Sequence, residues 1–216
     1  MSRAPHPVIR SASALGVVAI LGVTLLAGVD QLTADKIAEQ ERKVILNQLG
    51  QIVPASRYDN AMQDDFFSFR DERYFPQGQE VTAYRARSDG RPVAVILRFD
   101  AVNGYNGRIR LLVGIESDGR LAGVRVVSHK ETPGLGDAIE TAKSDWIHGF
   151  DGKSLASPAP SRWAVRRDGG EFDQFTGATI TPRAIVEAVR GALEYFDVNR
   201  PALFETAADG RQETAP

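Results

Sequence analysis

The feature that most constrains the fold of this chain is an uncharged run of nineteen residues near its N-terminus, at 11–29. A helix of this length measures about 28 Å, close to the roughly 30 Å hydrocarbon thickness of a bilayer. Arg3 and Arg10 precede the run and Asp30 follows it, so the positive-inside rule places the short N-terminus in the cytoplasm. The sequence therefore predicts one transmembrane helix, with the rest of the chain on the outer side.

A cleavable signal peptide is the competing interpretation of this run. The apolar region of a signal peptide usually has about 7 to 15 residues and ends at a small-residue cleavage site. The run is longer than that, and its end, Leu26-Ala27-Gly28-Val29, is a poor match to such a site. A retained anchor is the better interpretation, which leaves a cytoplasmic N-terminus at 1–10.

The segment after the predicted anchor, 30–79, combines a helical stem with a linker. Its first part has good helix formers, no glycine or proline before Gly50, and apolar residues among alternating charges, which predicts a juxtamembrane helix. Val53-Pro54 ends this stem, and a polar, aromatic stretch at 58–76 links it to the next domain. Three phenylalanines in the linker are expected to cover the domain core rather than to enter the membrane surface: Phe66, Phe67 and Phe69.

Four strand-like stretches follow from Glu80 onwards. They are rich in Val, Ile, Leu and Tyr, and strong hairpin signals separate two of the pairs, Ser88-Asp89-Gly90 and Ser117-Asp118-Gly119. Such stretches joined by short turns predict an antiparallel sheet. The expected strands are 81–87, 92–99, 108–116 and 121–128.

The second half of the same domain, 80–200, is expected to add helices to this sheet. The pattern favours a helix at 137–148 and another short strand at 163–166. The sequence thus predicts an α+β fold, a mostly antiparallel sheet with packed helices, preceded by one N-terminal transmembrane helix.

A longer helix is predicted near the C-terminus. It begins at Pro182, with Thr181 as its N-cap, and its apolar side chains recur at spacings of three and four up to Phe196. The residues at 197–201 end it, and the polar tail at 201–216 is expected to be loose.

Composition and charge exclude several classes of site. The net charge of −2 gives no electrostatic footprint for a nucleic-acid partner. The chain has no cysteine, which rules out zinc–thiolate sites and cysteine-ligated iron–sulfur clusters. Its three histidines, His6, His129 and His148, lack metal-ligand spacing, so no metal site is expected.

The stretch most informative about function is Asp173 to Thr181, which reads Asp-Gln-Phe-Thr-Gly-Ala-Thr-Ile-Thr. Its small residues let a bulky group approach the backbone, and Thr179 stands just ahead of the predicted helix, whose N-terminus favours an anion. A phosphate-bearing group on this threonine would place its charge there. From residue types alone, an ordinary capped turn that leads into a helix remains the other interpretation.

Two separated motifs resemble the FMN-binding domain family. The segment Asp173–Thr179 is similar to that family's Asp-x-x-Ser/Thr-Gly-Ala-Thr signature, whose last threonine receives flavin mononucleotide (FMN) from a dedicated flavin transferase. The segment His129–Gly136, reading His-Lys-Glu-Thr-Pro-Gly-Leu-Gly, resembles the His-x-Glu-Thr-Pro-Gly-Leu-Gly segment that lines the flavin ring. The resemblance implies FMN attached covalently through a phosphoester to Thr179.

The same resemblance implies roles for the residues around that threonine. Asp173 is the acid recognised during attachment, and Lys153 is expected to face the flavin phosphate. His129 and Glu131 invite an acid–base interpretation, but we assign them to the flavin environment or to loop structure, and no catalytic residue is expected. The implied cofactor-binding residues are Thr179, Asp173, Thr176, Gly177, Ala178, Thr181, Glu131, Thr132, Gly134, Leu135, Gly136 and Lys153.

Further short segments of the sequence resemble segments in the G subunits of Rnf-type ion-translocating electron transport complexes. This resemblance implies a membrane-anchored electron-transfer subunit with covalent FMN in an ion-translocating ferredoxin:NAD oxidoreductase complex. It places the chain in a bacterial inner membrane, with the flavin domain in the periplasm and with other membrane subunits and a flavin transferase as partners. The segments and residues that carry this resemblance are Gly104-Tyr105, Trp146, Gly152-Lys153, Trp163 and Phe172-Asp173-Gln174-Phe175.

Three alternatives stay open. C subunits of sodium-translocating NADH:quinone reductases share both flavin motifs, although they tend to be longer and to have serine at the position of Pro182. An envelope adaptor would use the same fold without redox chemistry and would leave Thr179 unmodified. An independent periplasmic reductase would need a second substrate site, which nothing outside the flavin motifs suggests.

Overall fold

The computed structural model describes residues 15–16, 19–24 and 43–205. The predicted N-terminus at 1–10 and most of the predicted membrane helix at 11–29 lie outside these residues. No helix within the described ranges is both long and apolar enough to cross a membrane. The chain divides into two units, Met1–Ile45 and Leu46–Pro216, and the second contains the whole folded domain.

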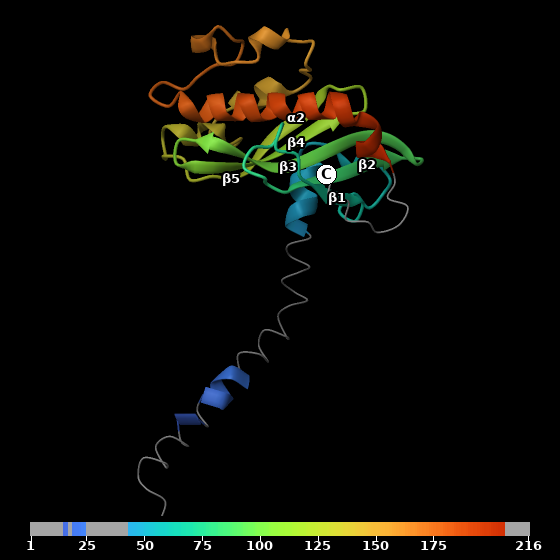
Figure 1. Ribbon diagram of the computed structural model, residues 1–216, viewed down its shortest axis with the longest axis vertical. Coiled ribbons are helices and arrows are strands. Elements are labelled where there is room, and N and C mark those ends of the chain that lie inside the picture. Colours follow the sequence, from blue (N-terminus) through green and yellow to red (C-terminus); the bar gives the residue numbers. More distant parts are fainter. Residues whose placement is uncertain (1–14, 17–18, 25–42, 206–216) are drawn as a thin grey trace, which may run out of the picture. The chain divides into compact units, whose positions relative to one another are not determined.

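A five-stranded antiparallel sheet forms the centre of the second unit (Figure 1). Each strand pairs with its neighbour in the sequence, in the order β1-β2-β3-β4-β5. The four predicted strands are confirmed, and β3 is longer than expected. The strands are β1 (Phe66–Phe69), β2 (Val81–Ser88), β3 (Arg91–Gly104), β4 (Gly107–Glu116) and β5 (Leu121–Ser128).

The predicted Asp-Gly turn between β2 and β3 has the geometry that a tight hairpin needs. Ser88 pairs with Arg91, so only Asp89 and Gly90 form the loop. Both have positive φ, 50° and 72°. Two positive φ values in a two-residue loop match the type I′ turn, whose twist agrees with that of the flanking strands.

One face of the sheet is covered by the long helix α2 (Ile180–Phe204), which lies across the strands (Figure 1). Ile185, Val189 and Leu193 of α2 belong to the hydrophobic core that this layer forms with the sheet. The predicted amphipathic helix is confirmed, but its start is not. The helix begins at Ile180, with Thr179 as its N-cap residue. Thr181 lies inside the first turn, and its hydroxyl donates to Glu131 instead of capping the helix.

The C-terminal end of α2 continues past the predicted stop. Asn199 has non-helical angles, φ −111° and ψ 15°, and marks a kink, yet helical structure resumes through Pro201 to Phe204. Two arginines of β2 explain this extension: Arg85 Nε donates to the Leu203 carbonyl at 2.9 Å and Arg87 Nη2 to the Phe204 carbonyl at 2.7 Å. The prediction of a loose tail is therefore wrong for 201–204, and 206–216 lies outside the described residues.

The other face of the sheet is partly covered by the residues that follow Leu46. Leu49, Ile52 and Val53 are buried, and Ile52 packs so closely on Gly114 of β4 that no side chain would fit there. The predicted linker also contributes to the domain, since it supplies β1 as an edge strand. The start of the folded unit thus moves from Glu80 to Leu46, because apolar side chains of the expected stem and linker have a sheet to pack on.

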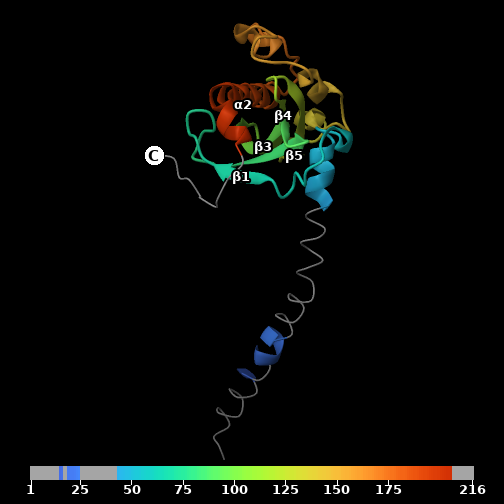
Figure 2. The same ribbon diagram turned by 90° about the vertical axis from the view of Figure 1, so that its right-hand side faces the viewer.

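The region between β5 and α2 consists of short 3-10 helices rather than the predicted helix and strand (Figure 2). Ser144 interrupts the expected helix, because its hydroxyl donates to the Ala138 carbonyl at 2.6 Å and accepts from the Trp146 N–H. In place of the strand at 163–166, Val165 makes a single bridge to Phe172. The 3-10 helices are η2 (Gly136–Ile139), η3 (Trp146–Phe150), η4 (Pro160–Arg162) and η5 (Arg166–Asp168), besides η1 (Ala55–Arg57) near the start of the unit.

Tyr195 of α2 is expected to make the stability of the protein depend on pH in the alkaline range. It stacks on Phe69 with ring centroids 4.6 Å apart. Burial raises the pKa of Tyr195 from 10.0 to about 12, Asp71 adds to the rise and Arg73 opposes it. Since the neutral phenol is favoured in the folded state, its contribution to stability is fully present below about pH 10 and is lost as the pH rises towards 12.

We expect Tyr195→Phe to remove this part of the alkaline loss of stability. The measurement is urea unfolding of both proteins in steps from pH 8 to pH 11.5, compared as differences between wild type and variant. Equal slopes in the two proteins above pH 10 would contradict the assignment.

Candidate functional site

The two motifs that resemble flavin-binding segments each contain a tight turn of the same kind. In the first, Leu135 N–H donates to the Thr132 carbonyl at 3.1 Å across Pro133-Gly134, and Gly134 has φ 78°. In the second, Ala178 N–H donates to the Phe175 carbonyl at 3.1 Å, and Gly177 has φ 82°. Glycine with positive φ in the third position is what a type II turn requires, with proline favoured before it. Gly134 and Gly177 are therefore needed for backbone geometry.

The turns lie close together although about forty residues separate them in the sequence. A Cβ on Gly177 would stand 3.6 Å from Leu135 Cδ2, so the tip of one turn contacts the other. Leu135 itself is 45% exposed. The structure thus brings the predicted ring-lining segment and the predicted attachment segment to one surface.

A buried carboxylate joins the two motifs. Glu131, 4% exposed, accepts through Oε2 a hydrogen bond from the hydroxyl of Thr181, which is 1% exposed. Its Oε1 accepts from the Asn106 N–H at 3.0 Å. Glu131 therefore links the loop after β5, the β3–β4 hairpin tip and the first turn of α2.

Two glycines make room for this carboxylate. A Cβ on Gly136 would lie 2.9 Å from Glu131 Oε2 and 3.0 Å from Thr181 Oγ1, and one on Gly104 would lie 3.0 Å from Glu131 Oε1. Gly136 belongs to the motif, whereas Gly104 and Asn106 lie outside both motifs. Asn106 was not among the predicted site residues, and the glycines on either side of the hairpin tip are the only sequence signal that points to it.

His129 makes hydrogen bonds to the loop backbone and to Glu140. Its Nδ1 accepts from the Glu131 N–H at 3.0 Å, and its Nε2 lies 2.9 Å from Glu140 Oε1. Because Nδ1 acts as an acceptor, the ring proton is on Nε2 and is donated to Glu140. Both histidine nitrogens and both Glu131 oxygens thus have partners within the protein.

The three threonines of the attachment segment differ in access to solvent. Thr176 is exposed, Thr179 is half-buried and Thr181 is buried against Glu131. Thr179 is the N-cap residue of α2, so its side chain stands beside N–H groups that the helix leaves without internal partners. An anion bound through Thr179 Oγ would be stabilised by this end of the helix.

Contacts from the preceding loops hold the attachment segment. Trp146 Nε1 donates to the Asp173 carbonyl at 2.7 Å, and the Trp146 ring lies 5.2 Å from that of Phe175. The Asp173 carboxylate is 61% exposed and pairs with Arg166 at 2.8 Å. Asp173 is therefore held through its backbone and has an accessible side chain.

Lys153 is engaged away from the predicted phosphate position. Its ammonium donates to Glu171 Oε1 at 2.5 Å and lies 5.6 Å from the centre of the Phe172 ring. The hydrogen bond from Lys153 lowers the pKa of Glu171. The structure places Lys153 beside Glu171 and Phe172, and none of its described contacts involves the two turns.

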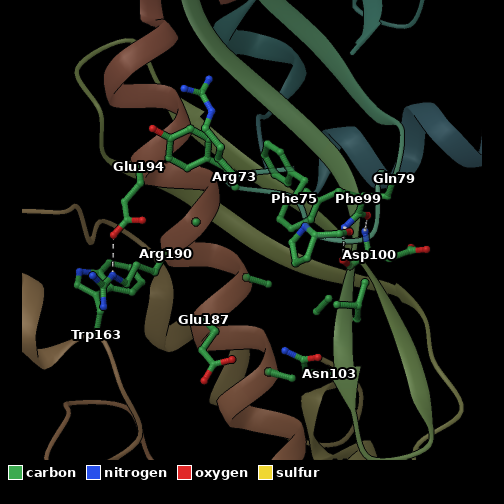
Figure 3. Close-up of a pocket in the computed structure, with 17 residues that line it drawn as sticks. Arg73, Phe75, Gln79, Phe99, Asp100, Asn103, Trp163, Glu187, Arg190 and Glu194 are labelled. Atoms are coloured by element: carbon green, nitrogen blue, oxygen red, sulfur yellow. Dashed lines mark hydrogen bonds and ion pairs between the residues drawn. The ribbon is translucent and has the colours of Figure 1, made fainter. Parts of the chain in front are cut away.

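A groove in the described part of the chain lies apart from the predicted cofactor-binding residues. A groove of about 310 Å³ is lined by residues of the loop at 73–79, β3 and α2, including Phe75, Phe99 and Arg190 (Figure 3). None of the predicted cofactor-binding residues lines this groove. Within the described part of the chain, no group of three acidic or histidine side chains could hold a metal ion. The candidate site is built on the two turns, which contact each other.

Removal of the hydrogen bond between Thr181 and Glu131 should lower the stability of the protein measurably. Thr181→Val keeps the shape of the side chain but leaves a buried carboxylate oxygen without its donor, and we expect the free energy of unfolding to fall by about 1–3 kcal/mol. Urea unfolding measures this change. Thr141→Val is the matched control, because Thr141 is exposed. If Thr181→Val and the control were equally stable, the buried link would have no energetic role.

Comparison with known proteins agrees with these two motifs. The profile of the FMN-binding domain family matches residues 104–194, a span that contains the hairpin tip, both turns and the first part of α2. The profile described as the RnfG N-terminal region matches residues 1–52.

Similar curated proteins cover nearly the whole chain. The chain is 52% identical to the G subunit of the ion-translocating oxidoreductase complex of Pseudomonas aeruginosa strain UCBPP-PA14 over 195 residues, 90% of this chain and 91% of that protein. The G subunits of the same kind of complex from Shewanella loihica and Vibrio cholerae are each 43% identical, over 94% and 88% of this chain and 95% and 90% of their own length. The chain belongs to the family of G subunits of ion-translocating oxidoreductase complexes.

Proposed function

We propose that this chain is the FMN-carrying electron-transfer subunit of an ion-translocating oxidoreductase complex. The observation that carries the proposal is the match of the FMN-binding domain to residues 104–194, because this span includes every contact made by Glu131. Relatives named as G subunits cover about nine tenths of the chain. They favour this assignment over a C subunit of a quinone reductase.

The cofactor is attached, in this proposal, through a phosphoester between FMN and Thr179. Three features of the chain fit such a group: a half-buried threonine at the N-cap of α2, a glycine turn beside it and exposed apolar side chains next to it. Thr181 is a poor acceptor because its hydroxyl is buried and bonded to Glu131. Thr176 is accessible but stands a turn away from the helix N-terminus.

FMN supplies the redox chemistry, and the chain supplies position and electrostatics. Glu131 holds the ring-lining turn against the first turn of α2, which sets the distance between the attachment threonine and Leu135. The positive end of α2 stabilises the phosphodiester charge. No side chain of this site is assigned a proton-transfer or bond-making role in electron transfer.

The arrangement in the cell is part of the same proposal. The uncharged run at 11–29 anchors the chain in the inner membrane with its N-terminus in the cytoplasm, and the flavin domain lies in the periplasm. Other membrane subunits donate and accept the electrons, and a flavin transferase attaches the cofactor. By resemblance, the assembly moves electrons between ferredoxin and NAD while it translocates Na⁺ or H⁺.

The test uses the full-length chain purified in detergent from cells with and without the flavin transferase. We expect flavin fluorescence on a denaturing gel and a mass increment equal to FMN less one water, both only when the transferase is present. A chain that stays at its unmodified mass in cells with active transferase would refute covalent attachment and favour the adaptor.

A further inference from the structure

The described residues leave part of the sheet face opposite α2 open, and arginines line it. Arg98 of β3 lies between Leu97 and Phe99, which belong to the core beneath α2, so its side chain points to the other face. A hollow of about 320 Å³ opens there. Its charged lining consists of three arginines and two acids, so cations exceed anions by one: Arg98, Arg108, Arg110, Glu80 and Asp100.

Asp100, which is 8% exposed, holds two of these arginines in place. Its carboxylate accepts from Arg110 Nε at 2.8 Å and from Arg110 Nη2 at 3.3 Å, and it lies 3.8 Å from Arg108 Nη1. Gln79 fixes the strand at the same residue, because its side chain accepts from the Asp100 N–H at 2.7 Å and donates to the Asp100 carbonyl at 2.9 Å. Two guanidinium groups are thus ordered at the open side of the hollow.

Arg98 is the arginine of the hollow whose charge has no match. Its side chain is half-buried, and within the part of the chain that the structure describes its guanidinium makes no hydrogen bond or ion pair. A guanidinium has five N–H donors, and half-buried donors without protein acceptors are unfavourable. A carboxylate brought by a partner would supply these acceptors, and a bidentate pair of this kind is among the stronger hydrogen-bonded contacts in proteins.

An exposed aromatic side chain lies on the same face of the sheet. Phe66 of β1 pairs with Tyr84, which pairs with Ile96 of β3. Ile96 and Arg98 are two residues apart on one strand, so all these side chains share a face. Phe66 is 52% exposed, and its ring centre lies 5.8 Å from that of Tyr84. The other two linker phenylalanines pack against the core as expected from the sequence, whereas Phe66 does not.

We propose that this arginine face, defined by Phe66, Thr82, Arg98, Arg108 and Arg110, docks the chain on an acidic extramembrane segment of another subunit of its complex. The inference rests on the proposed function for the membrane-anchored arrangement, but it does not require the flavin. Arginine and aromatic side chains are enriched among the residues that carry most of the binding energy at protein interfaces. Arginine also matches the planar carboxylate of aspartate or glutamate through two parallel N–H donors.

The length of chain before the folded unit favours a protein over a lipid surface as the occupant. The folded unit begins at Leu46, and Ile52 packs on Gly114, which shares the arginine face because it pairs with Ile96. Sixteen residues, 30–45, separate Leu46 from the uncharged run at 11–29. A stem helix of that length would span about 24 Å, whereas lipid headgroups extend only about 5–7 Å beyond the hydrocarbon. Extramembrane segments of neighbouring subunits are therefore within reach of this face.

The test is photo-crosslinking within the intact complex purified in detergent. A benzophenone amino acid replaces Ser68, an exposed residue that shares the face because it pairs with Thr82, in the full-length chain produced with the other subunits and the flavin transferase. The crosslinking yield is compared between the otherwise unchanged chain, Arg98→Glu and Arg91→Glu, and the crosslinked peptides are identified by mass spectrometry. Arg91 is the matched control, because it is an exposed arginine at the opposite end of β3.

We expect the probe at position 68 to crosslink to an extramembrane peptide of another subunit that contains aspartate or glutamate. Arg98→Glu should lower the yield about tenfold or more, because it replaces an interface anchor by a like charge. Arg91→Glu should match the unchanged chain. The inference is overturned if the probe reaches only lipid or a second copy of this chain, if it gives no crosslink, or if Arg98→Glu leaves the yield unchanged.

Two further measurements separate docking from folding and from the proposed function. Arg98→Gln removes the charge and keeps a similar side-chain length, so it should also lower the yield, by about threefold or more, and it decides the matter if Arg98→Glu does not fold by far-ultraviolet circular dichroism. Intact mass should show the FMN increment in every variant. An increment without the crosslink overturns the docking face alone, whereas a crosslink without the increment overturns covalent attachment alone.

Discussion

The Thr179→Ala variant is expected to lose the FMN mass increment completely in cells that contain the transferase. The reason is chemical, because alanine has no hydroxyl with which to form the phosphoester. The fold should be retained, since Thr179 makes no side-chain capping bond to α2. Intact mass and in-gel fluorescence measure the loss, and far-ultraviolet circular dichroism shows that the protein is folded.

Two variants within the same segment serve as controls for this experiment. Thr176→Ala removes the exposed hydroxyl and Thr181→Ala the buried one, and both are expected to keep the increment. Thr181→Ala should nevertheless unfold more easily, because Glu131 loses a donor. If the FMN mass increment persists in Thr179→Ala and is lost in Thr176→Ala, the attachment site is Thr176 instead.

Arg85→Ala is expected to cause the largest loss of stability, about 3 kcal/mol in the free energy of unfolding. Arg85 is 4% exposed. Its guanidinium pairs with Asp65 at 3.0 Å, donates to the Leu203 carbonyl and lies 4.4 Å from the centre of the Phe67 ring. Alanine would leave the Asp65 carboxylate with only Arg87 and Asn60 as donors, and the Leu203 carbonyl without this donor.

Urea unfolding of the full chain gives the measurement, with Arg73→Ala as the control. Arg73 also pairs with an aspartate, Asp71 at 2.8 Å, but its side chain is 76% exposed, so no measurable change is expected. Equal unfolding midpoints for the two variants would show that the buried contacts of Arg85 contribute no more than a surface pair.

The strands could be predicted because their signals are local. Asp-Gly turns and alternating apolar residues defined the β2–β3 and β4–β5 hairpins without reference to the rest of the chain. β1 has four residues in a polar segment and becomes a strand only because β2 offers it an edge. The helix predicted at 137–148 does not form for a similar reason. The Ser144 hydroxyl donates to the Ala138 carbonyl, and this contact exists only once the loop has folded.

The candidate site was predicted in part for the same reason. Motif resemblance pointed to both turns, and the positive φ of Gly134 and Gly177 explains why glycine stands there. The bond between Thr181 and Glu131 spans fifty residues and turned an expected helix cap into a link between motifs. Asn106 belongs to neither motif, so only its hydrogen bond to Glu131 in the folded chain relates it to the site.

The strand order also has a consequence for how the protein is made. Each strand pairs only with its neighbour in the sequence, so the sheet can assemble in the order in which the chain leaves the ribosome. The apolar face built by β3 and β4 is not fully covered until α2, the last element of the described residues, has been synthesised. Chains that stop before α2 would therefore leave part of this face exposed and prone to aggregation.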